Sequence, residues 1–148
     1  MTTSKQPALI DTNVLVYAAD ITSPFHKDSK AIRDKGLNGE ISLCICPQIL
    51  NEFFAIVTDK KRVAKALTQK EALKEIEKYY SHENMTIIYP GVGIMEKTFD
   101  LLKKYKIEKQ DIFDTHLAAT MLLNDVKTIY TYNDSDFIRF KELQVVTP

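Results

Sequence analysis

Four acidic residues stand in apolar stretches of the sequence, where a lone carboxylate is costly: Asp11, Glu52, Asp114 and Asp136. An ionised carboxylate that is buried without a partner loses solvation that apolar surroundings do not replace. Two carboxylates about 4 Å apart repel by roughly 4 kcal/mol at an effective dielectric constant of about 20. If the fold brings these groups together, a bound divalent cation is the simplest relief. Oxygen ligands without accompanying His or Cys favour Mg²⁺ or Mn²⁺ over Zn²⁺.

The elements that must position these acids alternate along the chain. Short apolar runs predict strands at residues 8–10, 41–46, 86–89 and 127–131, and a fifth at the sheet edge at 144–147. Helical patterns and capping signals predict helices at residues 13–20, from Pro24 to Gly36 or Gly39, and at 47–59, 68–82, 94–105 and 110–124. This alternation predicts a three-layer α/β fold with a mainly parallel central sheet flanked by helices.

For three of the acids, the predicted fold indicates where the side chain should lie. In open α/β sheets, ligands bind at the carboxyl ends of the strands. Asp11 follows the first predicted strand, and Asp136 lies in the loop after the fourth. Glu52 shares a helix stripe with Ile49 and Ile56, so we expect it to face the core.

Asp114 lies in the first turns of its predicted helix, where the helix dipole favours an anion by about 0.3–1 kcal/mol. It shares a stripe with Leu117, Ala118 and Met121, and the small Ala118 and Ala119 allow the helix to approach the sheet closely. We therefore expect the carboxylates of Asp11, Glu52 and Asp114 to meet at one end of the sheet.

Composition indicates one ordinary soluble globular domain spanning residues 1–148. The chain has 148 residues, is 45% hydrophobic and 27% charged, and carries a formal net charge of zero, so no overall basic field attracts nucleic acid. The sequence contains no signal peptide and no run as long as a membrane span, which favours the cytoplasm. Cys44 and Cys46 would share one face of a strand, where the geometry disfavours a disulfide, so we interpret them as buried residues in a reducing compartment.

The ordered acidic segments resemble those of PIN-domain ribonucleases, specifically the VapC-type toxins of toxin–antitoxin pairs. The resemblance spans nearly the whole chain and rests on residues 9–18 (LIDTNVLVYA), 51–53 (NEF), 113–120 (FDTHLAAT) and 131–137 (TYNDSDF). Each segment is a weak pattern alone, and the ordered set is specific. The resemblance implies a PIN-like fold, cleavage of RNA with a Mg²⁺ or Mn²⁺ cofactor, a VapB-like antitoxin as partner, and a homodimer.

The resemblance also assigns roles to individual residues. It implies that Asp11, Glu52, Asp114 and Asp136 are catalytic metal ligands. Four further residues would support the cofactor site, of which the first three would hydrogen-bond the carboxylates: Thr12, Asn13, Thr131 and Asn133. Family members often have an acid at the position of Asn133, which is neutral here, so Asp136, Asp134 or Asn133 itself could complete the site. The number of metal ions stays open.

Other protein classes fit the sequence less well. Haloacid-dehalogenase-type phosphatases need a second aspartate where this chain has Asn13, and receiver domains need an aspartate at the end of a middle strand. The Gly91-Val92-Gly93 turn resembles a dinucleotide-binding loop, but Glu96 replaces its third glycine and would oppose a pyrophosphate. Within the PIN class, a non-toxin RNA-processing nuclease and an inactive scaffold that binds RNA or protein remain alternatives.

Two further features have open interpretations. We interpret His116 as a surface or partner-contact residue, because it lies two residues from Asp114 and so on another face of the helix. Basic residues gather in two segments, which are either solvated helix faces or a track for RNA: Lys60, Lys61, Arg62, Lys65, Lys70 and Lys74 in the first, and Lys103, Lys104, Lys106 and Lys109 in the second.

Overall fold

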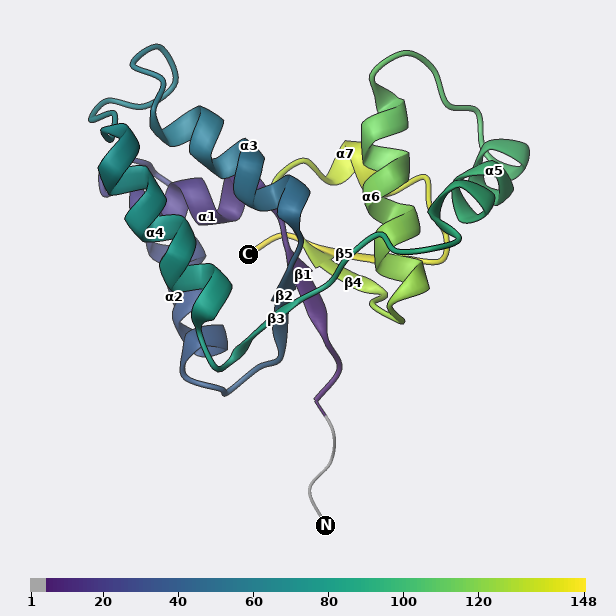
Figure 1. Cartoon of the computed structure of the whole chain (residues 1–148), viewed down its shortest axis with the longest axis horizontal. Helices are drawn as coiled ribbons and strands as arrows, with labels where there is room; N and C mark the ends of the chain where they lie inside the picture. The colour runs from purple at the N-terminus through teal and green to yellow at the C-terminus, as the bar shows by residue number, and fades with distance from the viewer. Residues whose placement is uncertain (1–4) are drawn as a thin grey trace.

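A single parallel sheet forms the centre of the computed structural model, which describes residues 5–148 (Figure 1). Its strands are β1 (Ala8–Ile10), β2 (Leu43–Ile45), β3 (Met85–Ile87), β4 (Thr128–Tyr130) and β5 (Gln144–Val146). Their spatial order is β3-β2-β1-β4-β5, and each neighbouring pair runs parallel. The predicted parallel sheet is therefore confirmed, and the fifth strand lies at the edge beside β4.

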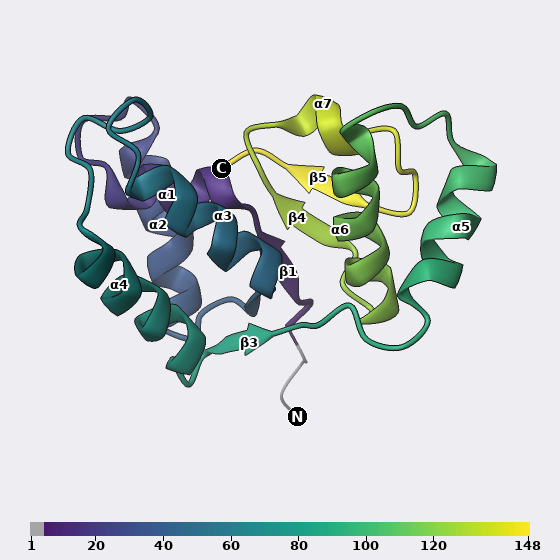
Figure 2. The same ribbon diagram turned by 45° about the horizontal axis from the view of Figure 1, so that its top comes forward.

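The helices form two groups, one on each side of the sheet (Figures 1 and 2). The first group contains α1 (Thr12–Ala19), α2 (His26–Leu37), α3 (Pro47–Val57) and α4 (Gln69–Ser81), and the second contains α5 (Ile94–Lys104), α6 (Asp111–Leu123) and α7 (Asp134–Phe137). Crossovers between parallel strands are right-handed, so the connections leading outward from β1 to β3 and those leading back to β4 and β5 place their helices on opposite faces. The three-layer α/β architecture is confirmed. Within residues 5–148, no helix combines the length and apolar character that crossing a bilayer requires.

The strand order reverses between β1 and β4. The chain winds from β1 outward to β2 and β3, and then returns to the other side of β1 to form β4. At such a switch point, the loops beyond the carboxyl ends of the two strands separate and leave room for a ligand. Asp11 follows β1 directly and Thr131 follows β4 directly, and the Asp11 backbone N–H donates to the Tyr130 carbonyl at 3.0 Å. Asp11 therefore lies at the position where folds of this kind usually bind ligands.

Both faces of the central strands β1 and β2 are buried, which explains their continuous apolar sequences. Leu9, Ile10 and Ile45 have no exposed surface. Cys44 and Cys46 are also buried and form no disulfide, and burial raises the pKa of their thiols to about 12 and about 11. They are apolar packing residues, as the sequence indicated.

Most element boundaries differ from expectation by one or two residues, and two differences have an identifiable cause. α2 begins at His26 rather than Pro24, because the Ser23 hydroxyl accepts a hydrogen bond from the Phe25 N–H at 3.1 Å and makes a turn before the helix. The single turn of α7 was not predicted, since four residues are too short for a helical period to register. Asp136 therefore lies in a helix and not in a loop.

Candidate active site

Asp11 is almost wholly buried at the carboxyl end of β1, with 6% of its surface exposed. Its carboxylate accepts hydrogen bonds from the Thr12 backbone N–H (2.8 Å), the Thr131 hydroxyl (2.8 Å) and the Asn13 side-chain amide (3.2 Å). Burial raises the pKa of Asp11 and the nearby Glu52 charge adds to the rise, while the hydrogen bonds oppose it. Within residues 5–148, no basic side chain forms an ion pair with this carboxylate.

Thr131 connects the loop after β4 to the first turn of α1. Its fully buried hydroxyl donates to Asp11 and accepts hydrogen bonds from the Asn13 side-chain amide (3.2 Å) and the Asn133 backbone N–H (3.0 Å). The Asn13 side-chain carbonyl in turn accepts from the Tyr132 backbone N–H at 3.1 Å. This network fixes the orientation of the Asp11 carboxylate relative to both strands.

Replacing Thr131 by valine is expected to lower the free energy of unfolding by about 1–3 kcal/mol, because the isosteric side chain lacks the hydroxyl that hydrogen-bonds the buried Asp11 carboxylate, the Asn13 amide and the Asn133 N–H. Denaturant unfolding followed by circular dichroism measures the change. Thr86→Val is a matched control on an exposed position of β3 and should change stability by less than about 0.5 kcal/mol. Equal effects of the two substitutions would contradict a supporting role for Thr131.

Glu52 points to the same end of the sheet from α3. Its carboxylate accepts hydrogen bonds from the Thr12 hydroxyl at 2.9 Å and from the Gln48 side-chain amide at 3.1 Å. The expectation that Glu52 faces the core is wrong: Glu52 is exposed, although Ile49 on the same stripe is fully buried. The reason is that its side chain is directed beyond the strand ends toward Thr12 rather than onto the sheet.

Asp114 lies in the first turn of α6 and is half-buried, while Leu117 on its stripe is buried. Burial raises the pKa of Asp114 to about 6, and the negative charges of Asp136, Asp11, Asp111 and Glu52 contribute. The charges of the three other acids that the sequence singled out thus act on Asp114. Repulsion of this kind favours a cation among them.

The three residues in the loop and helix after Thr131 differ in what they offer to the site. Asp136 is half-buried, and of the two acids in α7 it is the one whose charge acts on Asp114. Asp134 is exposed, and its carboxylate accepts a hydrogen bond from the Ser135 N–H at 3.0 Å. Asn133 is exposed and contributes its backbone N–H to Thr131. Of these three residues, Asp136 is therefore the one with an electrostatic effect on Asp114.

The donor set suits a hard divalent cation. The converging groups are carboxylates, and Mg²⁺ and Mn²⁺ prefer oxygen ligands. Within residues 5–148, no three Asp, Glu, His or Cys side chains are close enough together to hold a metal ion between them. An Mg²⁺ ion here would therefore be bound by one or two carboxylates, with waters in its other coordination positions. Asp11, Glu52, Asp114 and Asp136 are the residues that could hold the ion.

Sequence reasoning missed two groups that support this site. Gln48 lies one helical turn before Glu52, so its contact could have been found from the i, i+4 spacing. An aromatic cluster packs beside Asn13, with ring centroids 4.8–5.3 Å apart among Tyr17, Phe25 and Tyr132. No local sequence signal joins these three rings, because they come from two distant segments.

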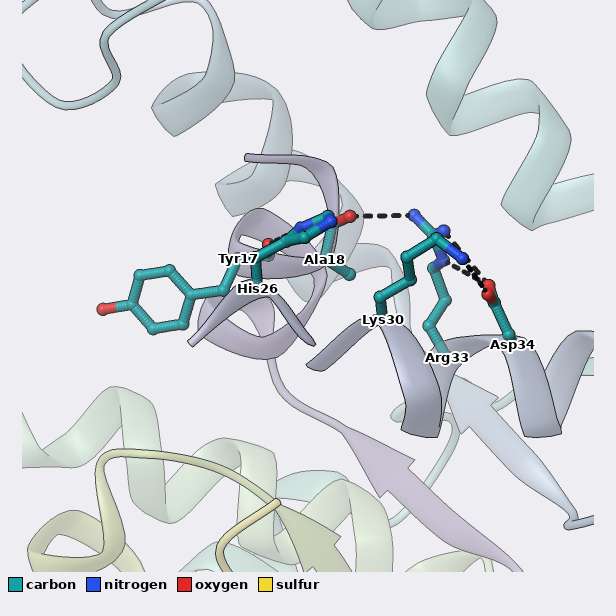
Figure 3. Close-up of polar contacts among 6 residues, drawn as sticks. All are labelled: Tyr17, Ala18, His26, Lys30, Arg33 and Asp34. Carbon is teal, nitrogen blue, oxygen red and sulfur yellow. Dashed lines mark hydrogen bonds and ion pairs between the residues drawn. The ribbon is translucent and has the colours of Figure 1, made fainter. Parts of the chain in front are cut away.

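The carboxyl end of α1 is held by side chains from α2 (Figure 3). His26 Nδ1–H donates to the Tyr17 carbonyl at 2.9 Å, and Arg33 donates to the Ala18 carbonyl at 3.3 Å while it pairs with Asp34 at 3.1 Å. The last carbonyls of a helix lack partners within the helix, and α1 has no basic residue in its own last turn. α1 is therefore fixed at both ends, by Asp11 at its N-cap and by α2 at its C-terminus.

The two basic segments contribute exposed loops at the same end of the molecule, on either side (Figures 1 and 2). Lys60, Lys61 and Arg62 lie between α3 and α4, and Lys106 and Lys109 lie between α5 and α6. Their exposure fits both interpretations of the basic residues, as solvated surface and as an RNA track.

Comparison with known proteins identifies the family of this fold. The sequence profile described as PIN domain matches residues 8–143. The chain belongs to the PIN-domain family. Among its relatives, Ribonuclease VapC48 of Mycobacterium tuberculosis is 24% identical over 138 residues, which cover 93% of this chain and 94% of VapC48. Ribonuclease VapC37 of the same species is 26% identical over 133 residues, covering 90% of this chain and 91% of the relative.

Solved structures of PIN-domain toxins share the fold over nearly the whole chain. VapC20 of Mycobacterium tuberculosis, described as a toxin that cleaves the sarcin–ricin loop, superimposes with a TM-score of 0.69 at 10% identity, covering 95% of this chain and 99% of VapC20. VapBC2 from Rickettsia felis, bound to a DNA fragment from its promoter, matches with a TM-score of 0.64 at 17% identity, covering 96% of this chain and 98% of that one. At these identities the likeness establishes the fold.

Proposed function

We propose that this chain is a divalent-metal-dependent endoribonuclease and the toxin of a VapBC-type toxin–antitoxin pair. The observation that carries the proposal is the set of carboxylates gathered at the switch point of a PIN fold, with Asp11 buried and oriented by three hydrogen bonds. The relatives that match this chain over almost their full length are named VapC ribonucleases. We further propose that residues 1–148 form a single PIN domain that acts on RNA in the cytoplasm.

In the proposed site, Asp11, Glu52, Asp114 and Asp136 hold Mg²⁺ or Mn²⁺. The ion, when bound, lowers the pKa of a coordinated water and stabilises negative charge on the phosphoryl oxygens. Thr131, Asn13 and Thr12 keep the carboxylates in position, so that little reorganisation accompanies substrate binding. No Ser or His nucleophile is needed.

The chain must also attract a polyanion to an acidic site. The exposed lysines and arginine of the two basic loops could contact the RNA backbone on either side of the acids, where they would lower its repulsion from the carboxylates. Lysine dominates these loops, so the contacts would act mainly as point charges rather than bidentate clamps.

For partners, we propose a VapB-like antitoxin and a second copy of this chain. Several structural neighbours are described as toxin–antitoxin complexes. A largely apolar hollow between the ends of α1 and α3 is a suitable seat for an antitoxin segment, lined in part by Val16, Ala19, Val57, Val63 and Leu67. A basic side chain of that segment could pair with the site carboxylates and compete with the metal ion.

A cleavage assay on the purified protein tests this function. Single-stranded and structured RNAs should be cut with Mg²⁺ or Mn²⁺ present and remain intact in excess chelator. Calorimetric titration with Mn²⁺ should show binding that is lost in Asp11→Asn. A protein that binds the ion but cuts only a processing substrate would be a non-toxin PIN nuclease, and one that binds no divalent ion would be an inactive scaffold.

A further inference from the structure

A hollow lies beside the acidic site, between α3 and α6 and beyond the ends of β2 and β3. It has a volume of about 360 Å³. The residues around it come from separate elements and include Pro47, Gln48, Asn51, Glu52, Pro90 and His116. Pockets that bind small organic ligands begin at about 300 Å³, so a nucleobase and part of its sugar fit this space. The hollow opens to solvent and shares Glu52 with the proposed metal site.

Its lining combines flat apolar walls with a few polar groups. Pro47 and Pro90 supply apolar surface from α3 and from the segment after β3. Asn51 is exposed and His116 is half-buried, so an amide and an imidazole both border the space. Asparagine and glutamine amides pair with base edges through one donor and one acceptor, and adenine matches them bidentately. Unstacked RNA bases also stack on rings such as that of histidine.

Glu52 connects this hollow to the proposed chemistry. It borders the hollow, accepts a hydrogen bond from Gln48 at 3.1 Å, and accepts another from Thr12 at 2.9 Å on the Asp11 side. A nucleotide whose phosphate lies at the carboxylates would therefore have the hollow next to it. His116, interpreted from the sequence as a surface or partner-contact residue, is half-buried at this hollow.

We propose that this hollow binds the base of one unpaired nucleotide adjoining the scissile phosphate, and that Asn51 and His116 set the base preference at that position. This inference rests on the proposed ribonuclease function. Asn51 and His116 are specificity-determining residues here and take no part in bond cleavage. Adenine is the base that best matches the amide.

The test compares cleavage of RNA libraries in which one position beside the cut is A, C, G or U. Wild-type protein should discriminate at one flanking position, and Asn51→Ala should reduce the ratio of kcat/KM between preferred and other bases by about tenfold, since one bidentate contact distinguishes bases by roughly that factor. His116→Phe should retain more of the preference than His116→Ala, because it keeps a stacking ring. Asn38→Ala, an exposed asparagine at the end of α2, is the matched control.

Binding of RNA with 2-aminopurine at that position gives a readout without cleavage, because this fluorescent purine stacks as adenine does and offers an amide one donor, its 2-amino group, beside one acceptor, N1. In metal-free buffer, wild-type protein and Asn38→Ala should quench the 2-aminopurine fluorescence when they bind the RNA. With the same fraction of RNA bound, Asn51→Ala and His116→Ala should quench it much less. Unchanged base preference and quenching in the latter two variants would overturn the inference while the ribonuclease function stands. If Asn51→Ala and His116→Ala lose binding to the antitoxin but keep the base preference, the inference is also overturned, and the hollow is a contact site for the antitoxin. Failure of wild-type protein to cut any RNA would overturn both proposals.

Discussion

Asp114→Asn is expected to lower RNA cleavage at least about 100-fold while the folded protein becomes more stable without metal. Loss of a ligand carboxylate weakens the stabilisation of charge in the transition state, and removing one group that stabilises such charge typically costs about 10²–10³ in rate. The same change removes a negative charge from a site where burial and four neighbouring acids raise the pKa of Asp114 to about 6. Cleavage rates with Mg²⁺ and unfolding curves in chelator measure the two effects.

The pH dependence of the difference in stability between wild-type protein and Asp114→Asn shows whether the charge of Asp114 causes that difference. In the unfolded chain Asp114 titrates near its ordinary pKa of 3.8, and in the folded protein near 6, so the folded state binds the proton more tightly. Below about pH 4 wild-type and variant should therefore be similarly stable. Between about pH 4 and pH 6 the carboxyl is ionised in the unfolded chain but protonated in the folded protein, so over this range the wild-type protein loses about 1 kcal/mol of stability relative to the variant, after allowance for solvent screening at this partly exposed group. Above about pH 6 the difference should stay constant.

Asp100→Asn is the matched control, since Asp100 is exposed on α5. It should change neither cleavage nor the pH dependence. A loss of several kcal/mol in metal-free Asp114→Asn would contradict the proposal and make the acid a structural residue.

Asp11→Asn should also abolish cleavage but should not stabilise the fold, because an amide cannot accept all three hydrogen bonds that the Asp11 carboxylate accepts.

Expression of this chain alone in a bacterial host is expected to arrest growth. An active endoribonuclease with an open site degrades RNA that the cell needs, so the colony count after induction should fall by several orders of magnitude. Co-expression of a cognate VapB-like antitoxin should restore growth, because the antitoxin covers the acids. Plating efficiency and the pattern of cellular RNA on gels measure both results.

Growth is compared after expression of Asp114→Asn and of the control Asp100→Asn, at protein levels matched by immunoblot. The first should permit growth and the second should arrest it. Harmless expression of abundant, folded wild-type protein would contradict the toxin assignment. It would leave a non-toxin PIN nuclease, if RNA is cut in vitro, or an inactive scaffold, if it is not.

Local sequence patterns were sufficient for much of the fold. The apolar run at β1, the capping box of Thr68 and Glu71 at α4, and the small residues of α6 each form a local signal, and the structure contains all three elements. The boundaries of α2 and the single turn of α7 were not predictable to the residue. A turn hydrogen bond decides the former, and the latter is too short to show a period.

The sequence by itself determined which residue types could do chemistry: carboxylates without partners in apolar surroundings, at strand ends and on helices. It determined this because the cost of burying a charge and the periods of helix and strand are both local properties. Only the tertiary structure decided that Glu52 faces away from the core, that Thr131 orients Asp11 across 120 residues, and that His116 borders a hollow beside Glu52. Those relations depend on how distant strands and helices pack, and that packing leaves no periodic trace in the neighbouring residues.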